Sequence, residues 1–204
     1  MTTIRVATFL TAVLFSASFA SADDKKPADK PAAAAPAGGA PAAAPPAMPT
    51  PPPELDATFK SYEGNWKCET KFPPNAMGPG SPEMTAKSIV KIKKDKDLGG
   101  FWYRGDYEIK KTKTMPGFKG TFYMGVDPGS KQAMVVGVDN MGGMSTGAGP
   151  LGETIIYTGT GVMMGQKVAT RETMTKKSDK EVFHKIEMDM GKGFMPMGED
   201  ICKK

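Results

Sequence analysis

Histidine is nearly absent from this chain, because His184 is the single imidazole in 204 residues. This scarcity excludes every site that needs two imidazoles. Three-histidine zinc centres and the paired Glu-x-x-His sites of di-iron proteins are examples.

The excess of positive charge is also small. The chain has 27 Lys and Arg against 22 Asp and Glu, a formal net charge of +5. The lysines fall singly between apolar residues, as Lys87, Lys91 and Lys93 do, which is typical of the solvated face of a strand. We therefore expect no nucleic-acid partner.

The N-terminus has the pattern of a secretory signal peptide. Arg5 precedes an apolar run from Val6 to about Phe19, and Ala20-Ser21-Ala22 stands before Asp23. The run is too short to span a bilayer comfortably, and no cysteine follows it that could carry a lipid anchor. We predict a signal peptide over 1–22, cleavage after Ala22, a periplasmic or secreted protein and no membrane span after cleavage.

Two further regions follow. Residues 23–53 are dominated by proline and alanine and have almost nothing to bury, so we predict a semi-extended, disordered linker. This linker is either an envelope spacer or plain disorder. Residues 54–204 are long enough for one domain with its own core.

The remaining sequence predicts one short helix and then only strands. Proline ahead of the first turn, early acidic residues and the terminator Gly64 indicate a helix of two to three turns after Pro53. Later segments alternate with period two between Gly, Pro or Asp residues. The predicted strands cover 64–72, 83–94, 100–110, 118–126, 131–139, 143–149, 153–160, 167–176, 180–190 and 195–203. Ten short antiparallel strands favour an all-β, up-and-down barrel with an apolar, aromatic inner face.

The motifs resemble those of a known family. Gly64-Asn65-Trp66 is similar to the Gly-x-Trp that opens the first strand of lipocalin-type (calycin) barrels. The rest resembles a secreted bacterial family of domains of unknown function, numbered fifteen seventy-nine, with that fold. The matching pieces are Leu98-Gly99-Gly100-Phe101, residues 116–120, Gly125-Val126-Asp127, residues 137–147 and Arg171. The resemblance implies a calycin-like barrel without a known activity, in which a basic side chain covers Trp66; Arg171 is the candidate.

A possible hydrolase motif is present at Gly143-Met144-Ser145-Thr146-Gly147, with Asp179 and His184 after it. A nucleophile elbow needs a strand, a sharp turn and a helix. Ser145 is instead followed by Gly147, Gly149, Pro150 and Gly152, which cannot begin a helix. We interpret the match as coincidental and expect no enzyme.

His184 itself has two interpretations. It lies on the predicted inner face of the ninth strand, where one histidine could be an axial haem ligand. A core histidine hydrogen-bonded to a neighbour is the favoured interpretation.

Methionine is abundant near the C-terminus, where four of the 16 methionines fall within 188–197. With Gly191-Lys192-Gly193-Phe194 as the hairpin loop, Met190 would face Met195 and Met188 would face Met197. Four thioethers on one side could bind Cu(I). Because methionines also occur in most other strands, we favour their interpretation as flexible apolar lining.

Cys68 and Cys202 lie in the first and last strands, which become neighbours when the barrel closes. In an oxidising compartment they could form a disulfide around a loop of 134 residues. The hairpin register above turns Cys202 outward and Cys68 inward. A bulge at Gly198 would restore the pairing, so both states stay open.

Together these features favour a non-enzymatic, secreted or periplasmic barrel that binds a small apolar molecule. The alternatives are Cu(I) binding by the methionine hairpin, and a structural or partner-binding module whose barrel is filled. The candidate ligand-binding residues are Trp66, Phe101, Tyr103, Tyr107, Phe122 and His184.

Overall fold

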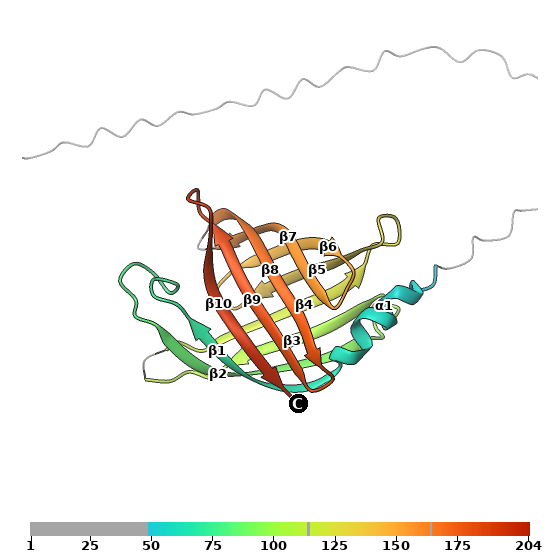
Figure 1. Cartoon of the computed structure of the whole chain (residues 1–204), viewed down its shortest axis with the longest axis horizontal. Coiled ribbons are helices and arrows are strands. Elements are labelled where there is room, and N and C mark those ends of the chain that lie inside the picture. The colour runs from blue at the N-terminus through green and yellow to red at the C-terminus, as the bar shows by residue number, and fades with distance from the viewer. Residues whose placement is uncertain (1–48, 114, 164) are drawn as a thin grey trace, which may run out of the picture. The chain divides into compact units, whose positions relative to one another are not determined.

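The computed structural model describes residues 49–204 except 114 and 164. The signal peptide and most of the linker predicted above lie outside the described residues. Figure 1 shows one barrel with a short helix at one of its ends. The elements are α1 (Pro53–Phe59), the 3-10 helix η1 (Lys60–Tyr62), β1 (Gly64–Phe72), β2 (Met84–Asp95), β3 (Trp102–Ile109), β4 (Phe118–Val126), β5 (Gln132–Asp139), β6 (Met144–Pro150), β7 (Thr154–Met163), β8 (Gln166–Ser178), β9 (Glu181–Asp189) and β10 (Phe194–Lys203).

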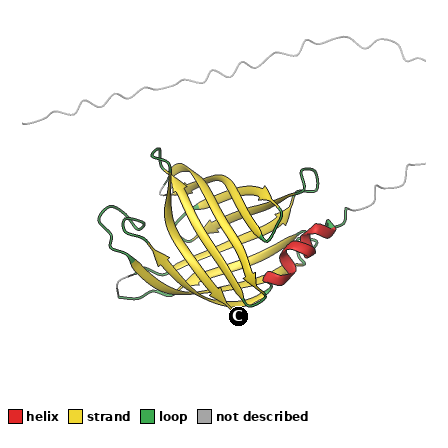
Figure 2. Ribbon diagram, viewed as in Figure 1, coloured by secondary structure: helices red, strands yellow, loops and turns green. Residues whose placement is uncertain are grey.

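The ten strands form a closed antiparallel barrel. Each strand pairs with the strands before and after it in the chain, and β1 pairs with β10 to close the sheet (Figure 2). The predicted all-β, up-and-down barrel with one short N-terminal helix is therefore confirmed. No helix within the described residues is long and apolar enough to cross a membrane.

The helix α1 covers the barrel end at which β1 begins and β10 finishes. Leu55 and Phe59 are fully buried there. Asp56 accepts hydrogen bonds from Lys94 Nζ at 2.7 Å and from Tyr103 Oη at 2.8 Å. The apolar stripe of the helix and its first-turn carboxylate thus anchor it over the interior. We call this end of the barrel the helix end.

A basic side chain covers Trp66, as the resemblance implies, but it is Lys204 and not Arg171. Lys204 Nζ lies 4.4 Å from the centre of the Trp66 ring and donates to the Ser61 carbonyl at 2.9 Å. Arg171 is on the outer wall, because its strand position is opposite outward-facing Glu187. Its guanidinium donates to Glu187 and lies over the ring of Phe194.

A bulge in β10 sets the register of the closing strands. The pairing of β9 with β10 shifts between Pro196 and Gly198, which returns Cys202 to the inner face. Cys68 lies directly opposite Cys202, and the two form a disulfide. Both cysteines are buried, so the cross-link closes the barrel from inside.

Candidate functional site

A polar cluster lies inside the barrel and is built by residues far apart in the sequence. Asp200 is opposite Thr70 on one side and opposite His184 on the other. Closure of the barrel therefore places β1, β10 and β9 side by side, so that inward side chains of these three strands meet. The cluster consists of Thr70 (β1), Ser88 (β2), Tyr107 (β3), Glu172 (β8), His184 (β9) and Asp200 (β10).

His184 lies between two carboxylates. Its Nδ1 is 3.1 Å from Asp200 Oδ2, and its Nε2 is 3.6 Å from Glu172 Oε2. Burial opposes the charged imidazolium, but the hydrogen bond with Asp200 and the negative charges of Asp200 and Glu172 outweigh burial and raise the pKa of His184 to about 10. The imidazole is therefore protonated at neutral pH.

Protonation removes two roles from His184. An imidazolium has no lone pair to ligate haem iron, and it cannot accept a proton as a general base. Both ring nitrogens of His184 face carboxylates, at 3.1 and 3.6 Å, which agrees with the interpretation as a core histidine held by its neighbours. Elsewhere in the described chain, as here, no three His, Cys, Asp or Glu side chains are arranged to hold a metal ion.

Asp200 has its hydrogen-bonding partners inside the protein. Besides the His184 contact, one carboxylate oxygen accepts from Thr70 Oγ1 at 2.5 Å. Since that hydroxyl has only one proton, its oxygen accepts from Ser88 Oγ at 2.9 Å and from Tyr107 Oη at 3.1 Å. Asp200 is therefore both charge-compensated and hydrogen-bonded.

Tyr157 of β7 has an unusual hydroxyl. The side chain faces the interior directly across from Glu172, and the residue is 3% exposed. The hydroxyl is buried without a hydrogen-bond partner among the described residues. Burial, followed by the charges of Tyr62 and Glu172, raises the pKa of Tyr157, so the phenol stays neutral. A buried polar group of this kind is costly unless something pairs with it.

The two halves of the interior differ in access. Near the helix end, Trp66, Tyr103, Met124 and Ile155 are at most 2% exposed. Towards the other end, which we call the open half, Ile109, Val168 and Thr170 are buried, but several other inward side chains of β3, β4, β8 and β9 are only partly buried. They are Tyr107, Phe118, Phe122, Glu172, His184, Ile186 and Met188. His184, for example, is 26% exposed despite pointing inward.

The predicted ligand-binding residues separate along this division. Trp66 and Tyr103 belong to the packed core under α1, and Phe101 lies before the start of β3. Tyr107 and Phe122 pack against this core from the open half and are only partly buried, as is His184. The ring of Phe122 lies across Gly105, where an added Cβ would overlap it. The alternation of the sequence predicts that these residues share the inner face. It does not predict which of them α1 buries.

The methionine hairpin differs from its predicted register. Met188 faces Met195, Asp189 faces Phe194, and the loop is 190–193. The Asp189 carboxylate accepts backbone N–H groups of Gly191, Lys192 and Gly193 at 2.7–3.0 Å, which fixes the loop one residue earlier than predicted.

This register separates the four methionines. Met190 is in the loop and 52% exposed, while Met197 falls within the bulge beyond Pro196. The expected pairs Met190–Met195 and Met188–Met197 are therefore wrong. The convergence of four thioethers on which the Cu(I) interpretation rested is not formed.

The Gly-x-Ser-x-Gly motif lies in a strand except for its first residue, Gly143, which directly precedes β6. Ser145 is within β6, opposite Gly137 on one side and Gly161 on the other. The strand, turn and helix of a nucleophile elbow are not formed at this position. Asp179 is exposed beside the β8–β9 turn and pairs with Lys176.

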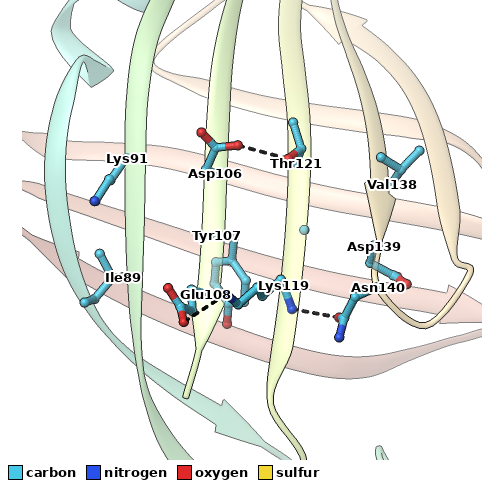
Figure 3. Close-up of a pocket in the computed structure, with 11 residues that line it drawn as sticks. Ile89, Lys91, Asp106, Tyr107, Glu108, Lys119, Thr121, Val138, Asp139 and Asn140 are labelled. Carbon is cyan, nitrogen blue, oxygen red and sulfur yellow. Dashed lines mark hydrogen bonds and ion pairs between the residues drawn. The ribbon is translucent and has the colours of Figure 1, made fainter. Parts of the chain in front are cut away.

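A hollow on the outer wall is a different kind of surface. Figure 3 shows it across β2 to β5, with Lys91, Asp106, Thr121 and Val138 among its lining residues. Several of its polar groups pair with each other: Thr121 Oγ1 donates to Asp106 at 2.9 Å, and Lys119 Nζ lies 3.5 Å from Glu108 Oε1. Because these paired groups are exposed to solvent, we place the candidate site in the interior instead.

Comparison with known proteins gives one family. Residues 52–196 match the family described as Protein of unknown function (DUF1579), and no curated protein matches the chain. The match extends from the residue before α1 into the first residues of β10 and covers more than half of the sequence. The chain therefore belongs to the DUF1579 family.

Proposed function

We propose that this protein is a secreted or periplasmic, non-enzymatic binding protein that holds one small, largely apolar molecule in the open half of its barrel. The observation that carries the proposal is the partial exposure of inward apolar side chains. Phe118, Phe122, Ile186 and Met188 face the interior without being fully covered. Binding sites for small molecules are concave and mostly apolar, with a few polar groups that fix orientation.

The proposed location has two supports. The N-terminal sequence has the pattern of a cleaved signal peptide. The buried Cys68–Cys202 disulfide is of a kind that persists in oxidising compartments. The proposed absence of catalysis is supported by Ser145, which is part of a strand, and by His184, which is protonated and held by carboxylates.

The test is titration of the mature chain, residues 23–204, with the neutral fluorescent probe N-phenyl-1-naphthylamine. We expect saturable one-to-one binding. Phe122→Ala should weaken it about tenfold or more, because burial of a phenylalanine side chain contributes about 1.5–3 kcal/mol. Phe183→Ala is the matched control, because Phe183 is on the outer face of β9.

Thermal unfolding of both variants checks that they are folded. The proposal would be contradicted if the probe did not bind saturably, or if Phe122→Ala and Phe183→Ala bound it equally well. The second result would place the binding surface outside the barrel.

A further inference from the structure

We propose that the open half of the barrel selects molecules whose polar end is a protonated amine, with Glu172 as the counter-charge and the Tyr157 hydroxyl as a second acceptor. This inference rests on the proposed function and specifies the chemical class of its ligand. It follows from the charge balance of the interior and from a polar atom that the protein leaves unpaired.

The interior cluster has one cation and two anions. His184 and Asp200 compensate each other at 3.1 Å, and Thr70 completes the hydrogen bonding of Asp200. Glu172 is left with the weaker contact, because its Oε2 lies 3.6 Å from His184 Nε2, beyond an ordinary hydrogen bond. The cluster therefore has a net negative charge centred on Glu172, whose side chain is 17% exposed.

The described strands place no other cation in the open half of the interior to balance this charge. At the inward positions of the described strands in the open half, neither lysine nor arginine occurs. Both arginines of the barrel point outward, where Arg104 pairs with Asp106 and Arg171 with Glu187. A ligand carboxylate would enter this space beside an unbalanced glutamate, and its desolvation would have no compensating cation.

Tyr157, whose ring belongs to the core cluster with Tyr62, gives a second indication of a ligand group on the strand next to Glu172. Antiparallel partners on one face lie about 5 Å apart, and Tyr157 is the partner of Glu172. Its buried hydroxyl has no hydrogen-bond partner in the described chain, and its oxygen is free to accept. An ammonium group carries three N–H donors and no acceptor. It can satisfy a carboxylate and a phenol oxygen together, which a carboxylate ligand cannot.

The apolar part of such a molecule also has a defined surface. Phe118 and Phe122 of β4 and Ile186 and Met188 of β9 face the same interior and are partly exposed. Methionine repacks around guests of different shape. We therefore expect selectivity at the polar end and tolerance at the apolar end.

The experiment compares three probes with the same apolar body: 2-(1-naphthyl)ethylamine, 2-(1-naphthyl)ethanol and 1-naphthaleneacetate. Each is titrated into the mature chain at pH 7.5 by isothermal titration calorimetry. Because a hydrogen bond to a charged group is about twice as strong as a neutral one, we expect the amine to bind about tenfold more tightly than the alcohol. The carboxylate should bind most weakly.

Variants locate the effect. Glu172→Gln should reduce amine affinity about tenfold and leave alcohol affinity within about twofold. Glu108→Gln, on the outer wall, should change neither. Tyr157→Phe removes only the unpaired hydroxyl, so it should keep the fold and still reduce the amine-to-alcohol ratio even if Glu172→Gln does not fold.

The outcomes separate this inference from the proposed function. The inference would be overturned if the alcohol bound with about the same affinity as the amine, or if the carboxylate bound most tightly. Either result would leave the apolar binding site intact. Absence of binding by all three probes would overturn both. An amine preference that survives in Glu172→Gln and in Tyr157→Phe would also overturn the inference.

Discussion

Removal of the Cys68–Cys202 disulfide should cost a large part of the stability of the barrel. The two cysteines are separated by 134 residues and join β1 to β10. In the chain-entropy model, a cross-link around a loop of this length stabilises the folded state by about 5 kcal/mol. Domains of this size are usually stable by about 5–15 kcal/mol, so the reduced barrel should be marginal.

The assay is urea unfolding of the mature chain, followed by the fluorescence of its two tryptophans. We expect the oxidised protein to exceed both the reduced protein and the Cys68→Ala/Cys202→Ala variant by about 3–5 kcal/mol in the free energy of unfolding. Val90→Ala is the matched control. It truncates a buried side chain of the neighbouring strand and leaves the cross-link intact, so it measures the cost of a cavity alone.

The result that would refute this reasoning is a loss below about 1 kcal/mol on reduction. The hydrogen-bonded ladder between 67–71 and 199–203 would then close the barrel without help. A large loss would instead mean that the protein depends on an oxidising compartment, which agrees with the proposed secretion.

Two further predictions concern charged side chains. The pKa of His184 is raised to about 10, above about 6.5 in an unfolded chain, so its stabilising contribution is complete below pH 6.5 and is lost as pH rises towards 10. His184→Gln should therefore be less stable than the unaltered protein at pH 7. Its free energy of unfolding in urea should also fall less between pH 7 and pH 10. An equal fall in both proteins would contradict the assigned ion pair with Asp200. Lys204→Met should lower stability by about 1 kcal/mol, because it removes the cation over the Trp66 ring. Lys203→Met, on the outer face, should have little effect, and equal losses in both variants would contradict the cation–π contribution.

The strands could be predicted from the sequence because each one combines alternation with clear terminators. β1 and β4 have the predicted bounds, 64–72 and 118–126. The positive-φ glycines at 142, 165 and 191 lie in turns between strands, where that conformation favours glycine. Period two and turn chemistry are local properties, so a single sequence contains them.

The candidate site could not be predicted because one residue of register decides it. Without the bulge between Pro196 and Gly198, Asp200 would face outward and His184 would lack its closest partner. The loop that sets the β9–β10 register depends on the side chain of Asp189, and alternation does not report such a contact. The sign of the bulge in the sequence was the cysteine pair, because Cys202 can face Cys68 only if the register shifts near Gly198.

The closure between β1 and β10 connects stability with the proposed binding site. The same pairing that places Cys202 opposite Cys68 also places Asp200 opposite Thr70, two residues along the ladder. Asp200 in turn holds His184, whose charge leaves Glu172 as the uncompensated carboxylate. A change that loosens this pairing would first disturb the position of Asp200, because its hydrogen bonds extend across the closure. Loss of the disulfide should therefore reduce amine selectivity before it abolishes apolar binding, since Phe118 and Phe122 lie on β4, away from the closing strands.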